Sequence, residues 1–476
     1  MKTTTSLSKN SVHFVGVGGI GISALAQWFL AQKWAVSGSD IVASGLTRKL
    51  QKEGVKVTIG HKKSHVGPKT SLVIYNQAIP PSNPELREAK RLKIPTFTYP
   101  EALGSLTRGF KTIAVAGAHG KSTTTALASL VFTEAGLDPT VILGTLLKQL
   151  GGKNFRAGKS DYLLIEADEW KASFLNYSPL FSIITNVDKE HLDFYKNYSN
   201  VKKTFLKFIS NIREGGILVV NKDDKKLYAL KSKIQKIAKH NNLKVIWYGA
   251  IINYSARNKI KKVLRVPGEH NVSNALAVYT LARALGIKEK TALEGLAKYR
   301  GAWRRMEYKG ELKDKNKESR IRGGKKNMIH DSKFMIPVYD DYAHHPTEIK
   351  ASLQAFREKF SNRKIICVFQ PHQAHRTQNL FKEFISAFDE ADFLVLLPIY
   401  QVAGRDKPHK GYSSKDLAEK IGIRNKELGI KNYVTYLPHP KRLRSFIRDS
   451  EFIIHDSVIV MMGAGDIVNY TDLLIK

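Results

Sequence analysis

Cysteine is nearly absent from this sequence: Cys367 is the only one among 476 residues. A single thiol excludes an intramolecular disulfide, which fits a reducing compartment such as the cytosol. Cys367 lies in the apolar run Ile365–Phe369, where we expect a buried small hydrophobic side chain and not a reactive thiol.

Long apolar runs are also missing. No stretch reaches the roughly 18 unbroken apolar residues of a membrane helix, and the opening MKTTTSLSKNSVHFVG has no apolar core of signal-peptide length. We therefore expect a cytoplasmic protein without membrane insertion. The hydrophobic fraction of 42% is ordinary for a globular chain, and the length suggests roughly two to four domains.

Acidic residues are few, with 42 against 77 basic residues and a net charge of +35. Such an excess attracts anionic substrates and polyanions. The lysines are scattered over the chain, and no dense basic block appears apart from a modest one near Lys309–Lys326. We therefore favour a lysine-rich surface with phosphate sites, and we expect no nucleic-acid partner. The origin of the excess is not apparent from the sequence.

Strand patterns alternate with helical patterns, which indicates parallel sheets covered by helices. The first αβ unit has a strand at Val12–Val15, a helix at Ile22–Leu30 and strand candidates at Ala35–Val36 and Pro95–Tyr99. In the second unit we expect strands at Thr112–Ala116, Tyr162–Glu166, Phe181–Thr185 and Ile217–Val220, and helices at Ser122–Ala135 and Asn271–Leu285.

The third unit follows a polar, lysine-rich stretch, Lys309–Lys333, which we interpret as a linker, a mobile hairpin or a local insertion without an apparent role. Its strands are expected near Met335–Asp340, Ile365–Phe369, Phe393–Leu397 and Val458–Met462. The coarse prediction is three successive αβ units.

Two glycine-rich turns follow strands and precede helices. The first, Gly16-Val17-Gly18-Gly19-Ile20-Gly21, matches G-x-G-x-x-G, in which glycines let the backbone approach a diphosphate at a helix N-terminus. Asp40 lies where an acid often receives a ribose hydroxyl. Taken alone, this motif supports a dinucleotide dehydrogenase.

The second turn is Gly117-Ala118-His119-Gly120-Lys121-Ser122-Thr123. Its Gly-Lys-Ser core matches a P-loop, in which backbone N–H groups hold phosphates, Lys121 reaches the β- and γ-phosphates and the Ser122 hydroxyl lies on Mg²⁺. Val115 occupies the usual first glycine position. We predict an ATP site here.

Polar residues after later strands add to this site. The run Glu166-Ala167-Asp168-Glu169 suits a hard cation that prefers oxygen ligands. His191, in TNVDKEHLD, is either a second metal ligand or an ordinary surface histidine. Asn271 and Asn274 share a helix face, where they either read an adenine edge or, in the case of Asn271, cap the helix.

Three further stretches place cationic or aromatic groups near expected strand ends. They are Trp303-Arg304-Arg305-Met306-Glu307, Asp340-Asp341-Tyr342-Ala343-His344-His345-Pro346-Thr347 and Phe369-Gln370-Pro371-His372-Gln373-Ala374-His375-Arg376-Thr377. An arginine beside an ATP site can stabilise transferring phosphoryl charge. The other two stretches place His and Arg where a loop can hold carboxylate and amine groups.

Together these stretches resemble the Mur ligases, and within that family the enzymes that use L-alanine. The quoted segments are HFVGVGGIGISALA, AGAHGKSTTT, EADE, TNVDKEHLD, PGEHNVSNALA, DDYAHHPTEI and FQPHQAHRT. The resemblance implies three domains, with boundaries that we place at 1–108, 109–302 and 303–476. In that reading the first domain is Rossmann-like and binds UDP, the central one is a P-loop ATPase, and the last is Rossmann-like and closes over the site.

The resemblance also implies the reaction. ATP, with Mg²⁺ or Mn²⁺, would phosphorylate the lactyl carboxylate of UDP-N-acetylmuramate, and L-alanine would displace the phosphate. Lys121, His191, Arg304, His344 and Arg376 would be catalytic. ATP would contact residues 117–123, Asn271, Asn274 and Arg304. Ser122, Glu166 and His191 would hold metal.

The acceptor and amino acid would contact the remaining predicted positions, which are Gly16, Gly18, Gly19, Ile20, Gly21, Asp40, Tyr342, His344, His372, Gln373 and Arg376. We expect a monomer or a weak homodimer.

Departures from the family pattern concern individual positions. The family usually has arginine where this chain has Gln373, which bears on amino-acid specificity. Ser122 replaces a commoner threonine with the same hydroxyl chemistry, and Asn76-Gln77-Ala78-Ile79 replaces a serine-rich loop.

The alternatives at this stage are a murein tripeptide recycling ligase with the same acceptor, an NAD-dependent dehydrogenase argued from Gly16–Gly21, and a nucleic-acid-binding protein argued from the charge.

Overall fold

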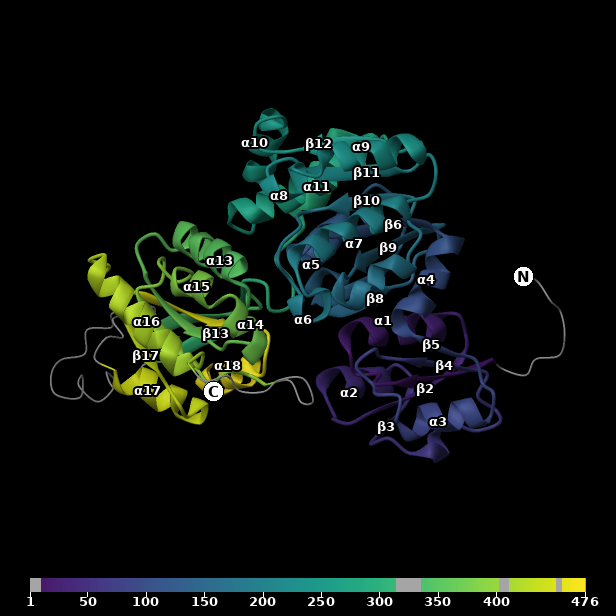
Figure 1. The fold of residues 1–476 in the computed structure, drawn as a ribbon, viewed down its shortest axis with the longest axis horizontal. Coiled ribbons are helices and arrows are strands. Elements are labelled where there is room, and N and C mark those ends of the chain that lie inside the picture. Colours follow the sequence, from purple (N-terminus) through teal and green to yellow (C-terminus); the bar gives the residue numbers. More distant parts are fainter. Residues whose placement is uncertain (1–9, 314–334, 402–410, 451–455, 476) are drawn as a thin grey trace, which may run out of the picture. The chain divides into compact units, whose positions relative to one another are not determined.

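The computed structural model describes residues 10–313, 335–401, 411–450 and 456–475. These residues build three sheets with helices packed on them (Figure 1), which confirms the predicted α/β class. The chain divides into two compact units. Unit 1 runs to Arg265 and includes Val272–Arg300, whereas unit 2 comprises Val266–Asn271 and the chain from Gly301 onward. The boundaries placed after residues 108 and 302 stay a prediction.

The first sheet is five-stranded and parallel, in the order β3-β2-β1-β4-β5. Its strands are β1 (Ser11–Val15), β2 (Ala35–Asp40), β3 (Lys56–Ile59), β4 (Leu72–Tyr75) and β5 (Thr96–Thr98). Its helices are α1 (Ile20–Ala31), α2 (Gly45–Lys52), η1 (Lys63–His65), α3 (Pro84–Arg91) and α4 (Tyr99–Gly109). The strand order reverses between β1 and β4, which is where ligands bind in open α/β sheets.

The second sheet is seven-stranded, in the order β12-β11-β10-β6-β9-β7-β8, with β8 antiparallel. Its strands are β6 (Lys111–Ala116), β7 (Thr140–Leu147), β8 (Lys153–Arg156), β9 (Tyr162–Ala167), β10 (Phe181–Ile184), β11 (Ile217–Asn221) and β12 (Lys244–Tyr248). Central strands such as β10 are buried along their whole length, as expected where helices cover both faces of a parallel sheet.

The helices of this part of the chain are α5 (Lys121–Glu134), η2 (Lys148–Leu150), η3 (Trp170–Asn176), α6 (Leu192–Tyr195), α7 (Tyr198–Ser210), α8 (Lys225–Tyr228), α9 (Lys231–His240), α10 (Tyr254–Val263), α11 (Glu269–Ala284) and α12 (Glu289–Ala297). Helix α5 packs against β6, β7, β9 and α12 and is buried almost throughout. The helix that follows the P-loop motif is therefore part of the core.

Buried polar groups connect the first two sheets within unit 1. The Asn154 side chain on β8 is fully buried; it donates to Ile20 O at 2.6 Å and accepts from Gln27 Nε2 at 2.9 Å. Ile20 and Gln27 belong to α1, the helix that follows the first glycine turn. Because each buried polar atom has a partner across the contact, these bonds favour one relative placement of α1 and β8.

The third sheet is six-stranded, in the order β13-β14-β18-β15-β16-β17. Its strands are β13 (Glu307–Lys313), β14 (Met335–Asp341), β15 (Lys364–Phe369), β16 (Phe393–Leu396), β17 (Tyr433–Tyr436) and β18 (Ser457–Met462). Its helices are α13 (Pro346–Lys359), α14 (Ala374–Asn379), α15 (Phe381–Ile385), α16 (Ser414–Glu427), η6 (Pro440–Arg442), α17 (Leu443–Asp449) and α18 (Ile467–Ile475).

Of the three interpretations of the stretch Lys309–Lys333, a linker is wrong for its start, because Glu307–Lys313 forms edge strand β13. The antiparallel pairing of β13 with β14 agrees with the hairpin interpretation. A bulge between Tyr308 and Gly310 shifts the register, so the alternation of side chains that would reveal a strand is broken. The rest of the predicted insertion, residues 314–334, lies outside the described residues.

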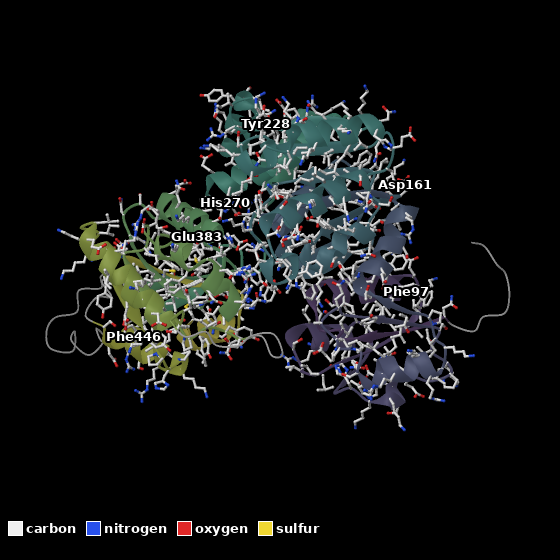
Figure 2. The ribbon with its side chains drawn as sticks, viewed as in Figure 1. Phe97, Asp161, Tyr228, His270, Glu383 and Phe446 are labelled. Atoms are coloured by element: carbon white, nitrogen blue, oxygen red, sulfur yellow. The ribbon has the colours of Figure 1, made fainter. Side chains whose placement is uncertain are left out.

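Side chains fill the space between helices and sheets (Figure 2). Phe174 of η3, for example, stacks on Phe208 with ring centroids 4.7 Å apart. Cys367 on β15 is fully buried, as predicted, and burial together with the charge of Asp341 raises the pKa of its thiol. Within the part of the chain described, no helix combines the length and apolarity needed to cross a membrane.

Candidate functional site

The first glycine turn lies directly after β1. Gly16 has φ +78°, and Gly16 N and Val17 N donate to Ser39 O at 2.8 and 3.0 Å. The Asp40 carboxylate accepts from Gly18 N at 2.8 Å. Asp40 thus pairs with the turn itself, at one of the amides that the motif offers to a ligand.

Close neighbours explain why this turn is built of glycine. A Cβ on Gly19 would lie 2.8 Å from Asn76 Nδ2, and one on Gly21 would lie 2.8 Å from the Tyr99 hydroxyl. Ile20, the first residue of α1, sits between them. Asn76 comes directly after β4, so the turn is packed against the loop that follows the neighbouring strand.

The second glycine turn joins β6 to α5, as predicted. Gly117 has φ +142° and a Cβ there would lie 2.0 Å from Thr185 Oγ1. Gly120 has φ +83° and precedes α5 as its N-cap. Non-glycine residues avoid this backbone region, and the contact at Gly117 excludes any side chain. The turn is thus held in the shape in which backbone N–H groups at a helix start can receive phosphate.

Lys121, the first residue of α5, points back across the turn. Its Nζ donates to Gly117 O at 2.7 Å and Ala118 O at 3.2 Å, and it pairs with Glu169 Oε2 at 2.7 Å. Burial lowers the pKa of Lys121, but the carboxylates of Glu169 and Asp168 outweigh burial and hold that pKa above its usual value. The ammonium is therefore charged, as phosphate binding requires.

Ser122 and Glu166 also meet at this turn. Ser122 Oγ donates to Glu166 Oε2 at 2.9 Å, and the other carboxylate oxygen of Glu166 accepts from Gly144 N at 2.6 Å. Thr123, the next residue of α5, is buried. A hydroxyl and a carboxylate oxygen side by side at a P-loop form a ligand pair suited to Mg²⁺.

His191 belongs to a second group of metal-ligand type. Asp168, Glu169 and His191 each offer a ligand atom, and these atoms lie within 4.8 Å of one another. Glu169 is 1% exposed, and its Oε1 has no hydrogen-bond partner among the described residues but lies 3.6 Å from His191 Nε2. An unsatisfied buried carboxylate oxygen beside an imidazole fits a divalent cation, so the donor set suits the predicted metal.

Residues after β10 fix the middle of the P-loop, and these roles were not predicted. The side chain of Asn186 accepts from His119 N at 2.9 Å, and Thr185 Oγ1 donates to His119 O at 2.6 Å. Asp188 pairs with His119 at 3.2 Å and with Lys226. Burial raises the pKa of Asp188, but these two partners outweigh it and leave the pKa far below its usual value.

Both predicted adenine-facing residues are buried in α11. A Cβ on Gly120 would lie 2.6 Å from Asn274 Oδ1, so the Asn274 amide packs on the P-loop. The Asn271 side chain donates to Pro267 O at 2.6 Å. Helix α11 begins at Glu269, so Asn271 lies within the helix and is not its cap.

Unit 2 gathers five of the predicted residues where β14 and β15 end. The rings of His344 and His372 have centroids 6.1 Å apart, and Tyr342 lies edge-on to His344 at 5.3 Å. Arg376 Nη1 donates to His372 O at 3.3 Å. Gln373 lies in the same loop with φ +72°, and its N–H donates to Tyr400 O at 3.0 Å.

Arg304 contacts Tyr342 but donates its side-chain hydrogen bonds to backbone carbonyl oxygens. Arg304 is 4% exposed, and its guanidinium donates to the carbonyl oxygens of Gly463 and Gly465. The guanidinium carbons of Arg304 and the partly exposed Arg305 each lie 5.1 Å from the centroid of the Tyr342 ring. In this conformation Arg304 holds the loop after β18, and its role toward phosphate stays a prediction.

The chain matches three family descriptions in succession. They are "Mur ligase family, catalytic domain" over residues 11–111, "Mur ligase middle domain" over 115–282 and "Mur ligase, glutamate ligase domain" over 328–467. The described sheets lie in the same order along the chain.

Individual relatives agree with these matches. The UDP-N-acetylmuramate–L-alanine ligase of Clostridium novyi is 37% identical, with 98% of each chain covered. A solved UDP-N-acetylmuramate–alanine ligase from Thermotoga maritima is 28% identical with a TM-score of 0.73, again with 98% of both chains covered. A murein peptide ligase from Psychrobacter arcticus shares the fold at 21% identity and a TM-score of 0.66, over 98% of each chain. This chain is thus a member of the Mur ligase family, with its three-domain α/β architecture.

Proposed function

We propose that this chain joins L-alanine to the lactyl carboxylate of UDP-N-acetylmuramate at the expense of ATP, in peptidoglycan precursor synthesis. The observation that carries the proposal is the 37% identity to a ligase of that name over 98% of both chains. The charged Lys121 at the P-loop supports the use of a nucleoside triphosphate. Cys367 is buried and is the only cysteine of the sequence, so no intramolecular disulfide can form. This supports a cytoplasmic location.

The glycine turn after β1 would bind the acceptor. Its backbone amides and the start of α1 suit a diphosphate, so Gly16, Gly18, Gly19, Ile20 and Gly21 would hold the UDP part. Asp40 would then receive a ribose hydroxyl after giving up its bond to Gly18 N.

The P-loop would bind ATP in the central part of unit 1. Lys121 would leave Glu169 and the carbonyl oxygens of the turn, and it would bind the β- and γ-phosphates instead. The negative charge of the phosphates would then replace that of the Glu169 carboxylate as the partner of the ammonium. Residues 117–123 would cradle the phosphates, with Asn271 and Asn274 near the base. Ser122 and Glu166 would hold Mg²⁺ or Mn²⁺, and His191 would hold a second ion. When bound, the metal would neutralise phosphate charge and polarise the transferring group.

The reaction requires no reactant other than the acceptor, ATP and L-alanine. A carboxylate oxygen of the acceptor takes the γ-phosphoryl group, and ADP leaves. The amine nitrogen of L-alanine then attacks the carbonyl carbon of the acyl phosphate, the bond to the phosphate oxygen breaks, and inorganic phosphate leaves. The attacking amine loses a proton, which His344 would accept as a general base.

The site for the amino acid and the acyl phosphate would be lined by Tyr342, His344, His372, Gln373 and Arg376. The guanidinium of Arg376 suits a carboxylate or an acyl phosphate, and the contact of the His344 and His372 rings places two imidazoles beside it. Arg304 would contribute only after leaving the carbonyls of Gly463 and Gly465.

A mixture of UDP-N-acetylmuramate, ATP and Mg²⁺, offered either L-alanine or the murein tripeptide, tests the proposal. We expect ADP and a product whose mass equals acceptor plus alanine minus water. A product formed only with the tripeptide would establish the recycling ligase instead. Absence of both products, with ATP and acceptor bound, would overturn the proposal.

A further inference from the structure

A short loop contacts both the first glycine turn and helix η3, which follows Glu169, the partner of Lys121. It comprises Asn76-Gln77-Ala78-Ile79 and follows β4. Asn76 and Ile79 face the turn, since a Cβ on Gly16 would lie 3.2 Å from each. Asn76 also accepts from Ala78 N through its side chain at 2.9 Å, which closes the loop on itself.

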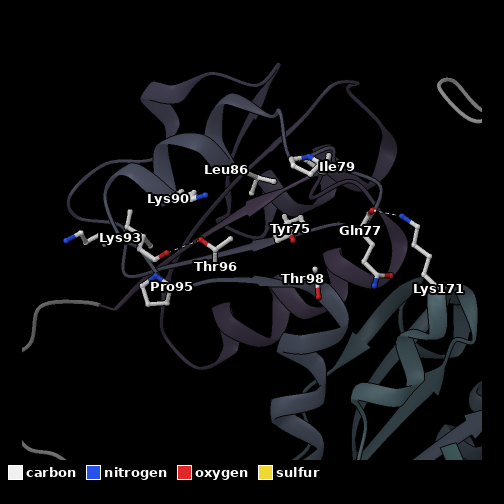
Figure 3. A pocket seen from close by; sticks show the side chains of 12 residues that line it. Tyr75, Gln77, Ile79, Leu86, Lys90, Lys93, Pro95, Thr96, Thr98 and Lys171 are labelled. Atoms are coloured by element: carbon white, nitrogen blue, oxygen red, sulfur yellow. Dashed lines mark hydrogen bonds between the residues drawn. The ribbon is translucent and has the colours of Figure 1, made fainter. Parts of the chain in front are cut away.

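Gln77, between these two residues, points the other way. The hydroxyl of Ser173 lies 2.8 Å from Gln77 Oε1 and 2.5 Å from Trp170 O, so its one proton is shared between these two acceptors. The backbone oxygen of Gln77 accepts from Lys171 Nζ at 3.3 Å. Figure 3 shows the bond to Lys171. Ser173 and Lys171 belong to η3. Gln77 therefore links the loop 76–79 to the central part of unit 1 through one side-chain contact and one backbone contact.

Helix η3 begins directly after Asp168 and Glu169. Two bonds tie it to them: Ala172 N donates to Glu169 O at 2.8 Å, and Phe174 N to Asp168 O at 3.0 Å. Glu169 in turn pairs with Lys121. A shift of η3 would therefore move Glu169, whose carboxylate competes with ATP for Lys121.

The backbone at the start of η3 is strained. The contacts between Gln77 and η3 lie beside open space. Lys171 and Ala172 are consecutive non-glycine residues with φ +50° and +57°, a backbone region that side chains disfavour. Gln77 and Lys171 border a cavity of about 820 Å³ (Figure 3). Phe174, two residues after Ala172, is fully buried and stacks on Phe208, so we expect any movement of η3 to be largest before Phe174.

We propose that Gln77 is a positioning residue that couples acceptor binding at Gly16–Gly21 to ATP binding at Lys121. Diphosphate in the first turn displaces Asn76 and Ile79, Gln77 passes the displacement to η3, and Glu169 releases Lys121. The inference rests on the proposed function, because it takes UDP-N-acetylmuramate and ATP as the two ligands.

Calorimetry on the full chain tests the coupling. The dissociation constant of the imido analogue of ATP, with Mg²⁺, is measured with and without saturating UDP-N-acetylmuramate. For the wild type we expect tightening within the range of roughly 5- to 150-fold that is typical of coupled sites. Gln77→Ala removes the side-chain contact with Ser173 but keeps the backbone oxygen that accepts from Lys171. We therefore expect the factor to fall severalfold, with the affinity for UDP-N-acetylmuramate alone changed less than about threefold.

Three further variants distinguish coupling from a general loosening of unit 1. Gln77→Glu keeps a side-chain oxygen that can accept from Ser173 Oγ, so it should retain the factor. Ser173→Ala should reduce it, and Gln77→Ala added to Ser173→Ala should reduce it no further. Lys49→Met is the control: it removes another bond across unit 1, from Lys49 Nζ to Gly152 O at 2.7 Å, and should leave the factor unchanged.

An unchanged factor in Gln77→Ala, an equal loss in Lys49→Met, or two ligands that bind the wild type independently would each overturn the inference. Failure of the proposed function looks different, because the wild type would then not bind UDP-N-acetylmuramate at all or would form no alanyl product from it.

Discussion

Lys121 and Glu169 form a buried ion pair, with 2.7 Å between Nζ and Oε2. The lysine that the P-loop offers to a triphosphate is therefore held by a carboxylate that is 1% exposed. Removing one partner of such a pair leaves the other buried and uncompensated, so the P-loop lysine stabilises the empty site as well as the bound one.

Lys121→Ala should abolish ADP release while leaving UDP-N-acetylmuramate binding largely intact, because the acceptor turn lies on a different sheet. We expect a loss of at least about 10²-fold in turnover, the scale seen when a group that stabilises transition-state charge is removed. Coupled ADP assays and calorimetry with the acceptor measure the two effects. The control is Lys111→Ala, which removes a surface pair with Asp161; similar turnover in both variants would refute the prediction.

Glu85 on α3 gives a prediction about pH. Its carboxylate is fully buried and accepts from Ser39 Oγ at 2.6 Å, with His65 at 2.6 Å and His13 at 3.6 Å. Burial raises the pKa of Glu85, but bonds from His13, Ser39 and His65 outweigh burial and lower that pKa to about 2. A lowered pKa stabilises the fold above the unfolded value near 4.5, and this contribution is lost as pH falls from 4.5 toward 2.

Glu85→Gln should therefore destabilise the fold at pH 7 by about 2 kcal/mol, as expected for hydrogen bonds to a buried charge. The difference between variant and wild type should shrink below pH 4.5. Thermal unfolding between pH 7 and pH 3 measures it. Glu88→Gln, one turn along α3 in a pair with the exposed Arg91, should change little at any pH. A difference that stays constant with pH would contradict this account.

Asn154→Ala should weaken the contact between the first two sheets. The change leaves the buried amide of Gln27 without its acceptor at 2.9 Å, and we expect a cost of about 1–3 kcal/mol. Urea unfolding and limited proteolysis of unit 1 measure it. Asn379→Ala, at an exposed asparagine on α14, is the control, and equal stability of the two variants would show that the buried network contributes nothing.

Gln373→Arg tests the departure from the family pattern. A guanidinium binds a carboxylate through two parallel hydrogen bonds, which an amide cannot do with the same charge. We expect the KM for L-alanine to fall about tenfold, equivalent to about 1.4 kcal/mol, with the KM for ATP unchanged. Gln378→Arg, further along α14, adds the same charge nearby and should leave both constants alone. An unchanged KM for L-alanine would remove Gln373 from the amino-acid site.

Much of the fold follows from local pattern. The buried strands β6, β9, β10 and β15 were predicted within one or two residues, because parallel strands covered on both faces are continuously apolar. The missing first glycine of the P-loop motif is also explained: Val115 is a fully buried residue of β6 and lies before the turn. The turn needs glycine only at Gly117 and Gly120.

The remaining features depend on contacts that spacing does not encode. Edge strand β13 is polar and bulged, and it is held by backbone pairing with β14. The sequence showed an arginine at Arg304 but not its direction, which follows from φ +54° and two distant carbonyls. Glu169 was one acid among several, and only the fold shows that it is the one that holds Lys121.

The burial of Cys367 has a practical consequence for spectroscopy. With its sulfur enclosed in β15 and ionisation suppressed, native protein should resist maleimide and methanethiosulfonate reagents. Cysteines introduced at surface positions of the two units could then be labelled with fluorophores or spin probes in the wild-type background. Distances between the units could be followed in solution as each substrate is added, without first replacing a native thiol.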